Sequence, residues 1–146
     1  MIDKKWIGHD LQTSTMTIER GRLRLFAKAI GETDPVYTDV EAAKAAGYPD
    51  LPAQPTFIFG IELESGSTDR LLNLLGIPFR KLLHGEQGFT YHKPVCAGDT
   101  ITVKPRITEI YDKKGGALEF VVKQAQALNQ AGELVAEMRT VLVCRH

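Results

Sequence analysis

The sequence has few of the side chains from which metal sites and disulfides are built. Its 146 residues include only two cysteines and four histidines. Cys96 and Cys144 are far apart and neither belongs to a Cys-x-x-Cys pair, so we expect two buried free thiols. His84 and His92 are eight residues apart, which is not a zinc-ligand spacing. These absences argue against a metal site.

Local motifs for nucleotides, phosphates and hydrolytic centres are also missing. The chain has no Gly-x-Gly-x-x-Gly, no phosphate-binding loop, no His-Glu-x-x-His and no Gly-x-Ser-x-Gly. We therefore expect no cofactor.

Neither sign of charge is in excess, and no long apolar run is present. Eighteen basic residues balance eighteen acidic ones, so no single-sign field points to nucleic acid or an anionic membrane. No apolar stretch approaches the roughly 20 residues that a membrane-spanning helix needs. The lysines near the first methionine are not followed by the apolar core of a signal peptide, so we expect a cytoplasmic protein.

Apolar spacing predicts helices in the first half of the chain. Leu23, Phe26, Ala27 and Ile30 fall on one helical face. The predicted N-cap of this helix is Thr17, and Gly31 is typical of a C-cap. Shorter helical segments follow, over Val40–Ala46, Thr56–Leu63 and Asp69–Leu75.

From Arg80 onward the apolar residues alternate with polar ones, as in strands. The pattern predicts one long or bent strand, then three more separated by turns, over 80–95, 101–107, 118–128 and 134–142. The turns at 113–116 and 129–132 are typical of hairpins. Helices followed by an antiparallel meander predict an α+β fold in one domain, residues 1–146.

The segment Gly31–Gly60 joins the helices to the sheet and carries Glu32, Asp34 and Tyr37 close together. Segments of this kind often display binding groups. Asp34 precedes a proline, which a turn explains. Glu32 and Tyr37 are less well explained by local turn chemistry.

A second polar group interrupts the predicted first strand at His84, Glu86 and Gln87. Either these side chains satisfy one another and the backbone, or they serve a site. A histidine exchanges protons near neutral pH, and a glutamine can position a carbonyl or hydroxyl group. Both interpretations stay open.

Three blocks of sequence carry a resemblance to a known family: IERGRLRLFAKAIGETDPVYTDVEAAKAAGYPDLPAQPTFIFG, HGEQGFTYHKPVCAGDTI and EMRTVLVCR. Together they resemble the hot-dog superfamily in its MaoC-like (R)-specific enoyl-thioester hydratase and dehydratase branch. The resemblance is greatest to the FAS1-like dehydratase module and to the non-catalytic-type subunit of two-subunit (3R)-hydroxyacyl-carrier-protein dehydratases. It implies an antiparallel sheet wrapped around a central helix, and modules that pair as homodimers or heterodimers with a second MaoC-like subunit.

The resemblance also implies site residues. Active members carry Asp-x-Asn-Pro-x-His in the entry loop, and a backbone N–H at a helix start polarises the thioester carbonyl. Here Glu32, Asp34 and Tyr37 stand at the aspartate, asparagine and histidine positions. The expected catalytic residues are Glu32, Tyr37 and His84. The expected substrate-binding residues are Asp34, Pro55, Thr56, Phe57 and Gln87.

Four functions remain open at this stage. The chain is a hydratase or dehydratase subunit whose partner supplies the Asp/His pair, or it is active alone with Glu32 as base and His84 as acid. Alternatively it binds acyl-CoA without chemistry, or it is a hot-dog thioesterase. The substrate expected for the first two is an acyl thioester of coenzyme A or acyl carrier protein.

Overall fold

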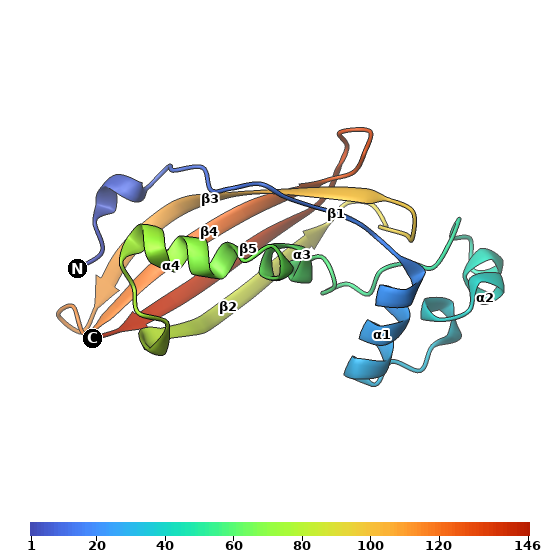
Figure 1. The fold of residues 1–146 in the computed structure, drawn as a ribbon, viewed down its shortest axis with the longest axis horizontal. Helices are drawn as coiled ribbons and strands as arrows, with labels where there is room; N and C mark the ends of the chain where they lie inside the picture. Colours follow the sequence, from blue (N-terminus) through green and yellow to red (C-terminus); the bar gives the residue numbers. More distant parts are fainter.

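A single five-stranded antiparallel sheet organises the protein. The structure is a computed structural model that describes residues 1–146. The strands run in the order β1-β3-β4-β5-β2 across the sheet, as Figure 1 shows. Their bounds are β1 Ser14–Thr17, β2 Leu82–Tyr91, β3 Thr100–Lys113, β4 Leu118–Leu128 and β5 Leu134–Arg145. The predicted α+β fold with an antiparallel sheet is confirmed. The predicted meander holds only for β3, β4 and β5, because β2 pairs with β5 at the edge of the sheet and not with β3.

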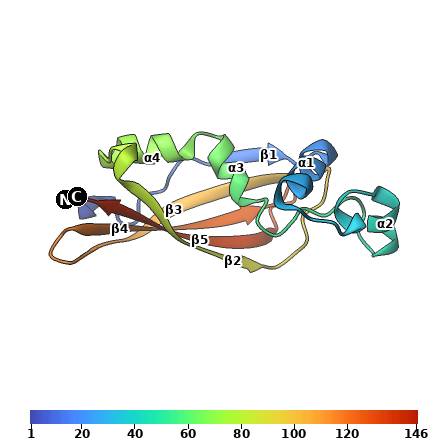
Figure 2. The same cartoon turned by 90° about the horizontal axis from the view of Figure 1, so that it is seen from below.

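Two short helices form the central helix of the fold. α3 (Phe59–Glu64) and α4 (Ser67–Leu75) lie across one face of the sheet, and the opposite face carries no helix (Figures 1 and 2). Gly66 separates them with a φ of 74°, a left-handed conformation that glycine adopts at little cost. The hot-dog arrangement expected from the resemblance is confirmed, with its helix broken in two.

The remaining helices lie beyond one end of the sheet in both views. These are α1 (Arg20–Ile30) and α2 (Val40–Ala45). Three 3-10 turns complete the chain: η1 (Lys4–Trp6), η2 (Pro35–Tyr37) and η3 (Phe79–Lys81). No helix combines the length and hydropathy needed to cross a bilayer.

The buried apolar residues form two clusters along the sheet. In one cluster, residues of α1 and of the 51–61 segment pack against the sheet; its members include Leu23, Leu51 and Ile101. The other lies under α4 and includes Leu72 and Val121. Because Leu23 is fully buried in the first cluster, α1 is held to the sheet by its own apolar face.

The start of α1 differs from the prediction. Thr17 is the last residue of β1, where its hydroxyl meets that of Thr100 at 3.0 Å, and the N-cap residue is Glu19. Because Thr17 pairs within the sheet, it cannot cap the helix. The C-cap prediction is confirmed, since Gly31 has a φ of 71° and donates its N–H back into the last turn.

The predicted strand over 80–95 is shorter in the structure and contains a β-bulge. β2 pairs with β5 from Leu82 to Tyr91, and the register shifts between His84 and Glu86. Gly85 sits at this bulge, where an added Cβ would lie 2.9 Å from Val143 Cγ2. The close approach of β5 explains why a residue without a side chain occupies this position.

Candidate functional site

The turn from Gly31 to Tyr37 is held by its own carboxylates. Glu32 Oε1 accepts hydrogen bonds from the N–H groups of Thr33 and Asp34, both at 2.9 Å. Asp34 Oδ1 accepts from the Val36 N–H at 3.0 Å and so caps η2. The turn interpretation of Asp34 is confirmed. Glu32, expected to act as a base, has one carboxylate oxygen committed to local backbone.

The 47–58 loop is fastened to α1 on one side. Arg20 and Asp50 form an ion pair at 2.6 Å, and the Leu51 N–H donates to the Asp50 carboxylate at 2.7 Å. These contacts lower the pKa of Asp50 from 3.8 to about 2, the Arg20 hydrogen bond being the larger cause and the Leu51 N–H the second.

The same loop is fastened to the sheet on its other side. The Tyr91 hydroxyl at the end of β2 donates to the Pro55 carbonyl at 2.7 Å. The Ala53 N–H donates to the Val95 carbonyl, also at 2.7 Å. Hydrogen bonds thus anchor the loop on both sides, so its position relative to the sheet is well defined.

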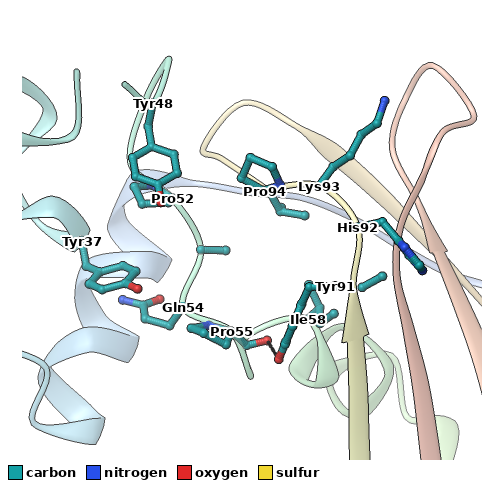
Figure 3. A pocket seen from close by; sticks show the side chains of 13 residues that line it. Tyr37, Tyr48, Pro52, Gln54, Pro55, Ile58, Tyr91, His92, Lys93 and Pro94 are labelled. Carbon is teal, nitrogen blue, oxygen red and sulfur yellow. Dashed lines mark hydrogen bonds between the residues drawn. The ribbon is translucent and has the colours of Figure 1, made fainter. Parts of the chain in front are cut away.

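A cavity of about 300 Å³ lies between this loop, the Tyr37 turn and the chain that follows β2 (Figure 3). Its apolar lining consists of Pro52, Ala53, Pro55, Ile58, Pro94, Val95 and Ala136. Its polar lining consists of Tyr37, Tyr48, Gln54, Tyr91, His92 and Lys93. A concave site that combines apolar side chains with polar groups is typical of a small-ligand site.

Two of the expected site residues line this cavity, Tyr37 and Pro55. Of the other loop residues, Thr56 is exposed and Phe57 is buried edge-on against Phe26, with 5.5 Å between the ring centroids. The Phe57 N–H closes a turn on the Gln54 carbonyl at 2.9 Å. The Thr56 N–H donates no hydrogen bond to another backbone group; Thr56 is not a lining residue itself but follows Pro55, which is.

The structure does not bring His84 or Gln87 to the cavity. Both lie on β2. His84 Nε2 is 3.1 Å from the Glu86 carbonyl, and the Thr140 hydroxyl donates to Gln87 Oε1 at 2.8 Å. Glu86 in turn accepts from Arg139 at 2.8 Å. These side chains do pair with neighbours and backbone, as the first interpretation expected; a site role for His84 and Gln87 stays a prediction.

Tyr37 is a hydrogen-bond donor rather than a base. Burial raises its pKa above 10.0, and the nearby carboxylate of Glu32 raises it further. The phenol therefore keeps its proton throughout the neutral range.

His92 lines the cavity but does not aim its ring into it. Its Nε2 lies 2.9 Å from a Glu137 carboxylate oxygen. In Figure 3 the ring points away from Tyr37 and Tyr48 on the opposite side. No carboxylate lines the cavity either, so the usual acid–base pair is missing from it. No three His, Cys, Asp or Glu side chains gather in a metal-binding group anywhere in the chain.

Sequence reasoning missed five polar residues of the cavity: Tyr48, Gln54, Tyr91, His92 and Lys93. Gln54 is 2 % exposed, and its Nε2 donates to the Leu23 carbonyl of α1 at 3.1 Å. One signal was available: a glutamine between the prolines at 52 and 55 has no turn role of its own. Tyr91 gave no comparable signal, because its partner is a backbone carbonyl 36 residues away.

Comparison with known proteins agrees with this architecture. The family model described as FAS1-like, dehydratase domain region, matches residues 5–138. A UPF0336 protein of Streptomyces avermitilis is 37 % identical over 145 residues, which cover 99 % of this chain and 95 % of that one.

Solved structures give the same fold. The C-terminally truncated HadBC (3R-hydroxyacyl-ACP dehydratase) complex of Mycobacterium tuberculosis superposes with a TM-score of 0.78 at 28 % identity, covering 94 % of this chain and 96 % of that one. A MaoC-like dehydratase gives a TM-score of 0.83 at 23 % identity, covering 96 % of this chain and 42 % of that one, and is evidence of the fold alone. This chain therefore belongs to the FAS1-like dehydratase-domain family and has the MaoC-like hot-dog fold.

Proposed function

We propose that this protein is an acyl-thioester-binding subunit of an (R)-specific hydratase or dehydratase. The reaction interconverts (3R)-3-hydroxyacyl and trans-2-enoyl thioesters of coenzyme A or acyl carrier protein. The observation that carries the proposal is the cavity beside Tyr37, which suits an acyl group but has no carboxylate in its lining, and whose one lining histidine, His92, turns its ring toward Glu137. A second MaoC-like subunit supplies the missing acid–base pair.

The chemistry explains why a partner is needed. Removing the proton at C2 and the hydroxyl at C3 requires a base and an acid that act near neutral pH. Tyr37 holds its proton too tightly for this work, and Glu32 does not line the cavity. What this chain offers is a place for the acyl group and hydrogen-bond donors. The Thr56 N–H is the donor we assign to the thioester carbonyl, where enolate charge develops.

The edge of the sheet at β2 is the proposed partner surface. β2 pairs only with β5, so its outer backbone groups are unpaired. Leu83 and Tyr91 on this strand, and Phe79 just before it, are exposed apolar side chains. The neighbouring HadBC structure is itself a complex of two subunits, which supports a heterodimer; a homodimer through the same edge is the alternative.

A simpler role remains as a second candidate, favoured by the same lack of acid–base groups. The chain would then bind acyl-CoA as a catalytically inert partner subunit. A thioesterase is less well supported, because neither a carboxylate to activate water nor a cysteine to attack the thioester lines the cavity.

The test is reconstitution of crotonyl-CoA hydration. The purified chain is assayed alone, and then co-expressed with a MaoC-like subunit that carries Asp-x-Asn-Pro-x-His. We expect no hydration by the chain alone, and hydration by the pair that exceeds the partner's own rate at least tenfold. Robust turnover by the lone chain would remove the need for a partner. A pair no faster than the partner alone would favour the inert binding role.

A further inference from the structure

Three cations that no carboxylate neutralises lie together at one end of the sheet. They are Arg80 and Lys81 on η3, and Arg145 at the end of β5. None of the ion pairs of the chain includes them. In Figure 1 this end carries the C-terminus and the β3–β4 hairpin, whereas α1 and α2 lie at the other end.

The three cations line one hollow of about 510 Å³. Its other lining residues are Ala117, Leu118 and His146, and no Asp or Glu lines it. The His146 N–H donates to the Ala117 carbonyl at 3.2 Å, and Leu118 pairs with Arg145 across the sheet. The pairing of β4 with β5 therefore fixes the shape of the hollow.

The one buried carboxylate beside the hollow is already engaged. Glu119 is paired with His146, and its side chain is 3 % exposed. One of its oxygens accepts from the Ile2 N–H at 2.6 Å, and the other contacts the His146 imidazole. His146 thus has its partner within the chain, and the two arginines and the lysine present their charge to solvent.

The register of the sheet brings two of the cations next to each other. Leu82 at the start of β2 pairs with Cys144 on β5, so Lys81 and Arg145 come next on the two neighbouring segments. Like charges on neighbouring strands repel, which weakens the pairing. An anion bound between them removes this repulsion.

The residue types in the hollow match a phosphate. The guanidinium of arginine is a planar fork that binds phosphate oxygens two at a time, and lysine adds a point charge. Three cations suit a ligand with two or more negative charges better than a single carboxylate. A long polyanion such as RNA is a poorer match, because much of the other positive charge is already paired with carboxylates. Examples are Arg20, Arg22, Arg106 and Arg139.

We propose that this hollow binds the phosphate groups of a small phosphorylated ligand. The site is distinct from the acyl cavity, because the ten residues of β2 lie between them and span about 33 Å at about 3.3 Å each. The inference therefore does not depend on the function proposed above. The phosphates could belong to a nucleotide coenzyme or to a free diphosphate, and the experiment below separates these two sources.

The first test needs no variant. Inorganic pyrophosphate is titrated into the isotopically labelled full chain, and the backbone amide signals are followed by NMR. We expect saturable shifts at Lys81, Ala117 and Arg145, and none at Tyr37 and Tyr48 of the acyl cavity. Unchanged signals at this end of the sheet, or shifts that do not saturate, would overturn the proposal.

Matched variants measure what single charges contribute. Lys81→Gln should weaken pyrophosphate binding about threefold to tenfold, the effect of one charge interaction close to solvent. Lys28→Gln makes the same change on an exposed residue of α1, and the affinity should stay within about twofold because salt screens so distant a charge. The double variant Arg80→Gln, Arg145→Gln should lose about tenfold or more. Affinity that survives in the double variant would show that the phosphate binds elsewhere.

Further ligands identify the source and test the chemical class. Adenosine 3′,5′-bisphosphate carries the phosphates of a nucleotide coenzyme, and pyrophosphate carries phosphate alone. Tighter binding of the bisphosphate, lost in the double variant, supports a coenzyme, and tighter binding of pyrophosphate supports a free diphosphate. Citrate and a short poly-glutamate peptide supply negative charge without phosphate. If citrate binds as tightly as pyrophosphate, the phosphate assignment is wrong. If the peptide does so, the surface belongs to an acidic protein partner instead.

Discussion

Glu62 on α3 and Lys123 on β4 form an ion pair between the central helix and the sheet. Lys123 Nζ lies 2.7 Å from Glu62 Oε1, and the two side chains are 9 % and 1 % exposed. The second carboxylate oxygen of Glu62 has no partner in the protein. The helix is therefore positioned over β4 by a charged contact as well as by apolar packing.

Removing one member of this pair should destabilise the protein strongly. Lys123→Met leaves Glu62 as an uncompensated buried charge, and we expect a loss of about 3–5 kcal/mol in the free energy of unfolding. The combined Glu62→Leu and Lys123→Met variant should recover most of that loss, because two apolar groups then meet. Urea unfolding of the single and double variants measures both. Losses that simply add would contradict the pairing.

The bulge in β2 predicts different tolerance at two glycines of the same strand. Gly85→Ala would place a methyl group 2.9 Å from Val143 Cγ2 and 3.2 Å from the Val141 carbonyl. We expect a loss of about 1–3 kcal/mol in the free energy of unfolding from this overpacking. Gly88→Ala is the control, since its nearest neighbour is Arg139 at 3.9 Å. Equal stability of the two variants, measured by chemical denaturation, would be inconsistent with the observed register shift.

Acid should weaken the attachment of the 47–58 loop to α1. The pKa of Asp50 is lower in the folded state, about 2, than its ordinary value of 3.8. A lowered folded-state pKa stabilises the protein above the unfolded value, and this stabilisation is lost as the pH falls from 3.8 towards 2. The thermal midpoint of Asp50→Asn should therefore lie below that of the unaltered chain at neutral pH. The two midpoints should converge near pH 2. A constant gap across this range would rule out the Arg20 contact as its source.

Both thiols should be inert in the folded protein. Burial is the main cause that raises the pKa of Cys96 and of Cys144, and the nearby carboxylates of Asp99 and Glu119 act in the same direction. The thiolate is the reactive form, so a disulfide reagent should modify neither residue at neutral pH until the chain unfolds. Rapid modification of a thiol in the native protein, followed by mass spectrometry, would show that its surroundings are open.

Features of the fold set by local chemistry could be predicted from the sequence. Gly31 ends α1 because a left-handed residue is needed there, and the turn at 129–132 follows from its Asn and Gly. The two-residue alternation after residue 80 gave the antiparallel strands. The start of α1 could not be predicted in this way, because Thr17 belongs to β1 and pairs with Thr100 on β3.

The site was harder to predict, because its polar groups are defined by distant contacts. Tyr37 could be singled out because turn chemistry does not explain it and because the family resemblance gives it a site position. The hydrogen bonds of Glu32 to its own turn depend on a side-chain rotamer, which the sequence does not specify. Gln54 is positioned by its hydrogen bond to Leu23 on α1, and Tyr91 by its hydrogen bond to Pro55 on a distant loop. Neither hydrophobic periodicity nor a local motif predicts hydrogen bonds between residues so far apart in the sequence.

The most direct test of the account is a crystal structure of the protein with butyryl-CoA. We expect the acyl group inside the cavity against Ile58 and Val95, with the thioester beside Tyr37. An acyl group bound elsewhere, for example on the helix-free face of the sheet, with this cavity unchanged, would contradict the assignment of the site.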